Sequence, residues 1–159
     1  MDWFEAPPRD GLEAAERLLH LLGALDMGGI LTSQGRRMLE LPLHPRLARL
    51  MTAAEDLGIP DTCRLGAALL ETGDLEARHT LDRTPSQPGP AALSDLLYRL
   101  DRFHLGEQAG AERVDPGALH RARQVLRSLE RRNTPTVTEP PDAEDRLRRA
   151  LLQAYPDRV

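Results

Sequence analysis

The chain has 159 residues, of which 40% are apolar and 29% are charged, and its formal net charge is −4. This balance is typical of an ordinary globular protein and excludes a disordered tail, a fibre, or a chain that coats nucleic acid over its whole surface. All 21 basic residues are arginine, so the chain has neither a Schiff-base lysine nor the phosphate-binding lysine of a P-loop, and it is not a self-contained NTPase.

The apolar residues are dominated by helix formers. The sequence has 29 Leu and 19 Ala but only four Val and two Ile, which predicts a mainly α protein. The acidic, proline-rich N-terminus differs from a signal peptide, and no stretch reaches the roughly 18 apolar residues of a membrane span. The single Cys63 allows no internal disulfide. We therefore expect a cytoplasmic protein without membrane contact, in which Cys63 is a buried thiol.

The first predicted helix follows an extended lead-in over residues 1–10. Apolar residues recur at helical spacing from Leu12 to Leu25. Gly23 and the turn at 26–29 end this helix, and the residues that follow the turn can form only a short strand over 29–31.

Two further helices complete a first domain over residues 11–58. Thr32 is a plausible N-cap for a helix over roughly 33–40, and Pro45 opens the next helix, which Gly58 stops. Three helices with one small β element are the make-up of a winged-helix domain.

Beyond this domain the pattern predicts a helical bundle over residues 59–159. Prolines predict loops near 84–90 and 133–141. Asp115 and Pro116 form an N-cap and first-turn pair that opens one of the helices. The predicted helices cover residues 61–72, 93–103, 116–132 and a last segment from about 142, with a further loop over 106–114.

The sequence carries no recognisable catalytic or metal site. It has no GxSxG or GxGxxG motif, and we expect no histidine to have an acidic or histidine neighbour at the i, i+4 spacing that a helical metal site uses. We therefore expect neither enzymatic activity nor a bound metal or cofactor in this chain. The scattered histidines are His20, His44, His79, His104 and His120.

The arginines of the helix predicted over 116–132 are more informative. Arg123, Arg127 and Arg131 recur every four residues and so share one face, about 140° from the apolar stripe of the same helix. Residues 117–132 carry five Arg and one Glu, a local charge of +4. Guanidinium groups match phosphate oxygens, which makes this face a candidate nucleic-acid site. The alternative is a solvated helix face.

Other arginines form weaker candidates. Arg99 and Arg102 lie three residues apart on the helix predicted over 93–103. Tyr98 and Tyr155 are isolated, so a base-stacking platform is weakly supported. A third group in the first domain consists of Arg36, Arg37, Arg46 and Arg49.

Several sequence blocks resemble a known family. The strings LLGALD at 21–26, GILTSQGR at 29–36 and LPLHPRLA at 41–48 are similar to the helicase-associated region of DEAH-box helicases. Two further blocks, ALLETGDL at 68–75 and AYPDRV at 154–159, resemble the bacterial HrpB-type branch. Residues 78–92 and 104–142 match little of the family pattern. The family continues past the last block, so we expect this chain to be part of a longer protein.

The resemblance implies a winged-helix domain followed by a ratchet-like helical domain. In the family these domains pack on the two RecA-like motor domains of the same chain and wall one side of a single-strand channel. The motor domains bind ATP and Mg²⁺ and drive translocation in the 3′→5′ direction. The implied partners of this chain are therefore its motor domains and single-stranded nucleic acid, with RNA expected, and Arg123, Arg127, Arg131, Arg99 and Arg102 are the candidate contacts.

Two other functions stay open at the level of sequence. Residues 1–80 carry a net charge of −5, which suits a protein-interaction or scaffold module that docks on a basic partner. A winged helix over residues 1–58 could also recognise duplex DNA, but its helices offer few basic residues to anchor phosphates.

Overall fold

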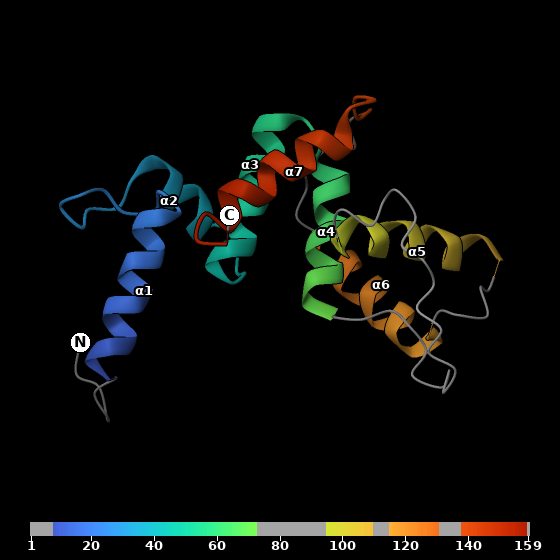
Figure 1. Ribbon diagram of the computed structural model, residues 1–159, viewed down its shortest axis with the longest axis horizontal. Coiled ribbons are helices and arrows are strands. Elements are labelled where there is room, and N and C mark those ends of the chain that lie inside the picture. The colour runs from blue at the N-terminus through green and yellow to red at the C-terminus, as the bar shows by residue number, and fades with distance from the viewer. Residues whose placement is uncertain (1–7, 73–94, 110–114, 131–137, 159) are drawn as a thin grey trace. The chain divides into compact units, whose positions relative to one another are not determined.

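The computed structural model describes residues 8–72, 95–109, 115–130 and 138–158, and within these ranges it confirms a mainly α protein (Figure 1). The described helices are α1 (Arg9–Leu21), α2 (Ser33–Leu39), α3 (Pro45–Leu57), α4 (Pro60–Thr72), α5 (Asp95–Ala109), α6 (Pro116–Glu130) and α7 (Ala143–Ala154). In the described part of the chain no helix is long and apolar enough to cross a membrane.

The chain divides into two compact units. The first unit contains residues 1–57 together with 145–159, and the second contains residues 58–144. The domains predicted from the sequence, 11–58 and 59–159, stay a prediction. The segment from Asp145 onward differs from the predicted domain of residues 59–159, because it packs with the first unit instead.

Several helices begin or end at the capping residues that the sequence predicts. The Thr32 hydroxyl caps α2 by accepting a hydrogen bond of 3.0 Å from the backbone N–H three residues later. Pro45 opens α3, and Gly58, just after α3, has a φ of 70°, in the left-handed region that favours glycine. The Asp115 carboxylate accepts a hydrogen bond of 2.8 Å from the N–H two residues later and so caps α6.

Some predicted boundaries were wrong. α1 begins at Arg9 rather than near residue 12, and α5 continues to Ala109 where a loop over 106–114 was predicted. A single glycine inside a helix costs only about 1 kcal/mol, so Gly106 does not end α5. Residues 29–31 form one isolated antiparallel bridge, between Leu25 and Leu31, instead of a strand. The proline-rich loop at 84–90 lies outside the described residues, as do positions 133–137 of the second predicted loop.

A compact joint between α1 and α2 explains two of the sequence blocks. The Thr32 hydroxyl donates to the Gly23 carbonyl at 2.6 Å and to the Ala24 carbonyl at 3.2 Å, while the Thr32 N–H donates to Ala24 O at 3.0 Å. Gly35 approaches the same carbonyl so closely that a Cβ at this position would overlap the Ala24 oxygen. The threonine and this glycine are therefore required by packing.

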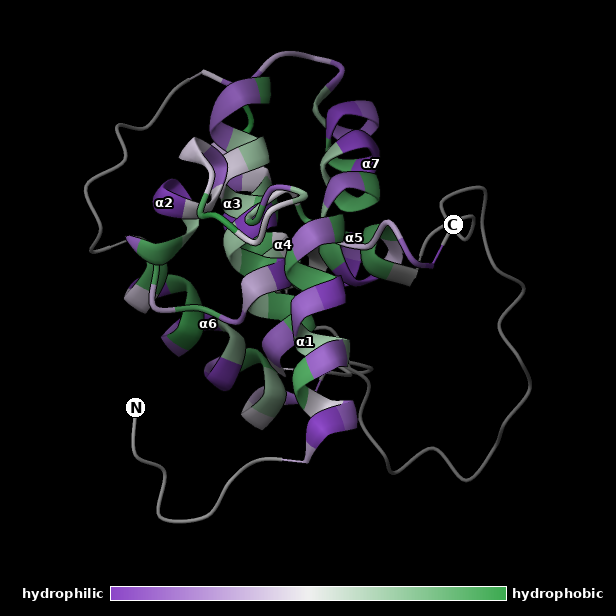
Figure 2. Ribbon diagram, turned by 90° about the vertical axis from the view of Figure 1, so that its left-hand side faces the viewer, coloured by the Kyte–Doolittle hydropathy of each residue, from purple (hydrophilic) through white to green (hydrophobic). Residues whose placement is uncertain are grey.

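Only the C-terminal part of α1 contributes to a core. Leu18 and Leu19 are partly buried against a cluster of Leu22, Ala24, Met38 and Ala48. The start of the predicted apolar stripe is not buried, since Leu12 is 52% exposed and no residue within α1 is buried. Figure 2 shows hydrophilic residues over much of α1.

The C-terminal segment is fastened to α3 by arginine contacts. Arg46 Nη1 and Nη2 donate to the two Asp157 carboxylate oxygens at 2.6 and 2.8 Å, and the Arg46 guanidinium lies 5.1 Å from the Tyr155 ring centroid. Arg146 Nη1 donates to the carbonyl of Leu57, at the end of α3, at 2.8 Å. We call the pairing of Arg46 with Asp157 and Tyr155 the C-terminal clasp. It gives the AYPDRV block a structural role.

In the second unit α4 packs against both α5 and α6. The buried residues follow the predicted stripes, and Cys63 is fully buried as expected. Burial and the nearby Glu139 carboxylate raise the pKa of the Cys63 thiol to about 12, so this thiol stays protonated at neutral pH. The buried residues of these helices include Leu65, Ala68 and Leu69 of α4, Leu96, Leu100 and Phe103 of α5, and Ala118, Leu119, Ala122 and Leu129 of α6.

The joint predicts opposite effects for two glycine substitutions. Gly35→Ala should lower the free energy of unfolding by about 1–3 kcal/mol, because the added Cβ forces the backbones apart. Gly11→Ala, in the exposed part of α1 with no atom within 4 Å of an added Cβ, should be neutral or stabilising by up to about 1 kcal/mol. Thermal unfolding of the two variants measures the difference, and equal effects would contradict the close packing of Gly35.

The clasp predicts a pH-dependent contribution from Asp157. The hydrogen bonds from Arg46 lower the pKa of the Asp157 carboxyl. A carboxyl with a lowered pKa in the folded state stabilises it above the unfolded pKa of about 3.9, and this stabilisation is lost as pH falls through the lower folded value.

Asp157→Asn should therefore lower the melting temperature at pH 7, and its difference from the wild type should shrink as the pH falls below about 4. Melting curves across this pH range test the expectation. A difference that persists unchanged in acid would show that the ion pair is not its source.

Candidate nucleic-acid interface

Two of the three arginines predicted to share a face lie together on α6. Arg127 is exposed and Arg123 is half-buried, and the Arg127 Nε donates to the Arg123 carbonyl at 3.3 Å. This bond holds the Arg127 side chain back along the helix, beside Arg123. Arg131 lies outside the described residues. The apolar stripe of α6 is buried at Leu119 and Leu129, as predicted, but Leu126 is only half-buried.

The arginines of α5 occupy a different environment. Arg99 and Arg102 are both half-buried, and the Arg102 guanidinium carbon lies 5.5 Å from the centroid of the Tyr98 ring. Arg102 is therefore engaged in a cation–π contact within its own helix. The Arg102 side chain is also less exposed than that of Arg127.

A small hollow joins the α6 arginines to apolar side chains. It has a volume of about 320 Å³ and is lined by Phe103 of α5 and by Arg123, Leu126 and Arg127 of α6. Phe103 is 5% exposed. No carboxylate is among these lining residues. We call this site the Phe103 hollow.

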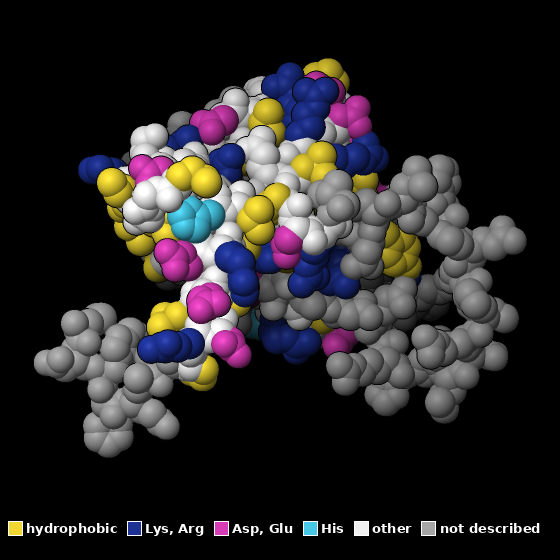
Figure 3. Space-filling view, turned by 60° about the vertical axis from the view of Figure 1, so that its left-hand side comes forward, with side chains coloured by type: hydrophobic (Ala, Val, Ile, Leu, Met, Phe, Trp, Pro, Cys, Tyr) yellow, Lys and Arg dark blue, Asp and Glu magenta, His cyan; other side chains and the backbone are white. Residues whose placement is uncertain are grey.

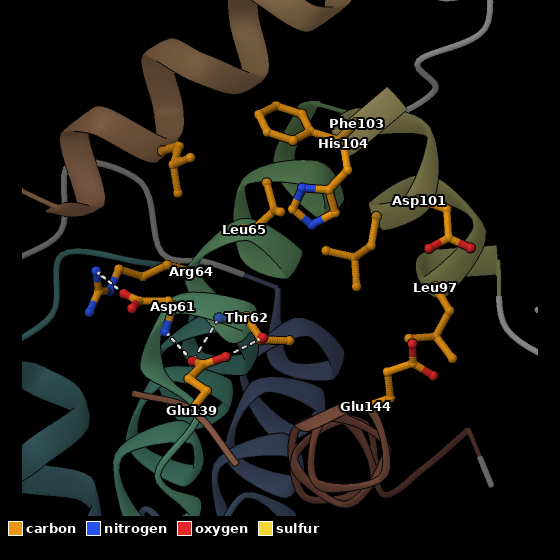
Figure 4. A pocket seen from close by; sticks show the side chains of 12 residues that line it. Asp61, Thr62, Arg64, Leu65, Leu97, Asp101, Phe103, His104, Glu139 and Glu144 are labelled. Atoms are coloured by element: carbon orange, nitrogen blue, oxygen red, sulfur yellow. Dashed lines mark hydrogen bonds and ion pairs between the residues drawn. The ribbon is translucent and has the colours of Figure 1, made fainter. Parts of the chain in front are cut away.

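A larger cavity of about 580 Å³ adjoins it and has the opposite charge. Phe103 and Leu126 line both spaces, but the larger one is also lined by four carboxylates and by only one arginine and one histidine. Figure 4 shows the Phe103 ring at the edge of this cavity, next to α6. Phosphate groups would be repelled here. The charged lining residues are Asp61, Asp101, Glu139, Glu144, Arg64 and His104.

Glu139, one of those carboxylates, stabilises the start of α4. Glu139 Oε1 accepts hydrogen bonds from the backbone N–H groups of Asp61 and Thr62 at 2.7 and 2.9 Å, and its other oxygen accepts from the Thr62 hydroxyl (Figure 4). These N–H groups belong to the first turn of α4, where they lack helical partners and where a negative charge is favoured by the helix dipole. Glu139 therefore caps α4 from a distant part of the chain.

The third arginine group is engaged within the fold. Arg37 Nη1 and Nη2 bind the carboxylates of Asp56 and Glu55 at 3.0 and 2.9 Å, and this pairing raises the arginine pKa. Arg46 belongs to the C-terminal clasp, and Arg49 donates to Gln153 at 2.8 Å. Of the four residues in this group, only Arg36 is exposed. These contacts leave little of the group available for nucleic acid.

The histidines and acidic residues do not gather into a metal site in the described residues. Glu16 lies four residues before His20, with 3.9 Å between its Oε1 and the histidine Nε2. The prediction that no histidine has an acidic neighbour at the i, i+4 spacing was therefore wrong for this pair. One carboxylate and one imidazole are too few ligands to hold a metal ion.

The surface charge is mixed on the face drawn in Figure 3. Basic and acidic side chains alternate there instead of forming one broad basic field. The apolar floor supplied by Phe103 and Leu126 was missed from the sequence, where both residues only marked the buried stripes of their helices.

The comparisons with known proteins agree with this architecture. The family "Helicase associated domain (HA2), winged-helix" matches residues 15–43. Over 117 residues the chain is 42% identical to the ATP-dependent RNA helicase HrpB of Escherichia coli (strain K12), an alignment that covers 73% of this chain and 14% of that protein. The crystal structure of the E. coli DExH-box NTPase HrpB matches 99% of this chain and 16% of that chain, with a TM-score of 0.57 and 29% identity.

The chain therefore contains a helicase-associated winged-helix domain, formed around α1, α2 and the joint between them. More narrowly, it is the helicase-associated region of an HrpB-type helicase. It spans about one seventh of the length of the curated relative that it matches.

The cap at α4 predicts how the second unit responds to loss of Glu139. Glu139→Ala should destabilise the protein by about 1–2 kcal/mol, because it leaves N–H groups at the start of α4 without their acceptor. Glu139→Gln keeps one acceptor oxygen and should cost less. Urea unfolding of both variants checks the order, and a Gln variant as unstable as the Ala variant would contradict the capping role.

Proposed function

We propose that this chain is the part of an ATP-dependent RNA helicase that walls one side of its single-strand channel. The Arg123 and Arg127 face of α6 contacts the phosphate backbone of the strand, in the cytoplasm. Arg99, Arg102 and Arg131 are secondary candidates for the same strand. The chain itself does no chemistry, and it couples ATP hydrolysis in the motor domains to 3′→5′ movement.

The observation that carries the proposal is the pair of arginines beside a hollow whose described lining residues include no carboxylate. Guanidinium groups pair with phosphate oxygens through charge-assisted hydrogen bonds. Arg123 and Arg127 lie on one helix face and would meet neighbouring phosphates of an extended strand. These contacts carry no base code, so they do not by themselves distinguish RNA from DNA. The printed function of the E. coli relative, an ATP-dependent RNA helicase, favours RNA.

Docking on the motor domains is supported by apolar residues left uncovered on the first unit. Met27 is fully exposed, Ile30 is 66% exposed and Leu12 is 52% exposed. Exposed residues of this size favour a protein interface. ATP and Mg²⁺ would bind in the motor domains of the longer protein, because this chain has no lysine for a phosphate-binding loop.

The proposal predicts salt-dependent binding of single-stranded RNA by the 159-residue chain. Fluorescence anisotropy at about 50 mM and about 200 mM salt should show binding that weakens steeply with salt, as expected when phosphates are neutralised. Arg123→Ala combined with Arg127→Ala should weaken binding about tenfold or more, and the salt slope should fall by about 0.7 for each phosphate that is no longer neutralised.

A matched control removes the same charge elsewhere. Arg36→Ala combined with Arg149→Ala replaces two exposed arginines of the first unit and should change affinity far less. Equal losses in the two double variants would show a general charge effect and contradict the α6 assignment.

A second candidate function is a protein-interaction module without nucleic-acid contact. The same exposed Met27 and Ile30, in a half of the chain with a net charge of −5, favour docking on a basic partner. Absence of RNA binding at low salt would favour this candidate.

A further inference from the structure

We propose that the Phe103 hollow binds a single unpaired nucleobase of the strand whose phosphates Arg123 and Arg127 contact. This inference rests on the proposed function and adds a base-binding subsite to it. From the sequence we expected only phosphate contacts on this face, and a base-stacking platform was weakly supported.

The size of the hollow limits what it can hold. Its volume of about 320 Å³ lies at the lower end of the roughly 300–1,000 Å³ found for small-ligand pockets. It therefore accommodates one planar group and excludes a base-paired duplex. The occupant must be a base that has left its stack, as bases of single strands do.

The lining of the hollow matches the two faces of a base. Phe103 and Leu126 provide an apolar floor, and the Arg123 and Arg127 guanidinium groups form the remaining wall. Planar guanidinium groups stack on aromatic rings and pair with phosphates, so an arginine here can cover a base and hold the adjoining phosphate. The Arg127 Nε bond to the Arg123 carbonyl, 3.3 Å long, keeps the Arg127 side chain beside this wall.

The carboxylates of the neighbouring cavity favour placing a nucleotide in the Phe103 hollow over placing it in the larger cavity. Four carboxylates line the larger space, whereas none is among the described residues that line the Phe103 hollow. A nucleotide placed in the larger cavity would bring its phosphate towards those carboxylates. The boundary formed by Phe103 and Leu126 therefore separates a space that repels a nucleotide from one that accepts it.

The test compares two strands of equal length and charge on the intact 159-residue chain. One is oligouridylate and the other is an abasic ribose–phosphate strand. Anisotropy at low salt should show oligouridylate binding at least fivefold tighter, which corresponds to about 1 kcal/mol, the lower end of the range for stacking of one base. This comparison uses the wild-type protein and does not depend on the folding of any variant.

Two variants test whether the preference for oligouridylate arises in the Phe103 hollow. Leu126→Trp fills the hollow and should abolish the preference for oligouridylate while keeping the affinity for the abasic strand. Ser128→Trp adds the same side chain at an exposed position of α6 and should keep the preference. Circular dichroism confirms that both variants are folded.

The outcomes separate this inference from the proposed function. Equal binding of the two strands by the wild type would overturn the base subsite and leave the phosphate contacts standing. Binding of neither strand would overturn both. An acidic peptide with one phenylalanine that binds as tightly as oligouridylate, and that loses affinity in Leu126→Trp, would assign the hollow to a protein partner and overturn the inference.

Discussion

The C-terminal clasp is the constraint that joins the two sequence segments of the first unit. Arg46 and Asp157 are 111 residues apart, yet their side chains form a two-pronged ion pair beside the Tyr155 ring. The neighbouring hydrogen bond from Arg146 to the Leu57 carbonyl joins α7 to the end of α3. The chain leaves the first unit after α3 and returns to it at α7. The second unit is thus an insertion between two parts of the first. A charged pair with this geometry fixes the position of its partners more narrowly than apolar burial alone, because the guanidinium fork and the carboxylate must be coplanar.

Because the chain has arginine and no lysine, the same guanidinium group serves both as a structural contact within the fold and as a candidate phosphate contact. Within the first unit, arginines bind carboxylates and backbone carbonyls of helices, as Arg37 and Arg46 do. In the second unit Arg64, 6% exposed, pairs with Asp61 at 2.7 Å. On α6 the same guanidinium group lines a hollow in which the described lining residues include no carboxylate. The local surroundings of each arginine therefore separate structural positions from candidate phosphate contacts, and the net charge of −4 does not.

The features that could be predicted from the sequence are those that depend on residues close to one another along the chain. Thr32, Pro45, Gly58 and the Asp115 cap act over three or four positions, and each sets a helix end where expected. The exposure of Leu12, the return of the C-terminal segment and the Phe103 hollow depend on which surfaces meet in space. Periodicity marks an apolar face without saying what covers it. For the same reason the α6 arginines could be placed on one face, but the apolar floor beside them could not be foreseen.

The central claim is that nucleic acid contacts α6 rather than the winged-helix unit. Hydrogen–deuterium exchange of the 159-residue chain, with and without single-stranded RNA at low salt, tests it most directly, because exchange reports protection segment by segment. The account predicts slower exchange in α6 and in the part of α5 that carries Phe103, with α2, α3 and α7 unchanged. Protection confined to the winged-helix segments, with α6 unaffected by RNA, would contradict it.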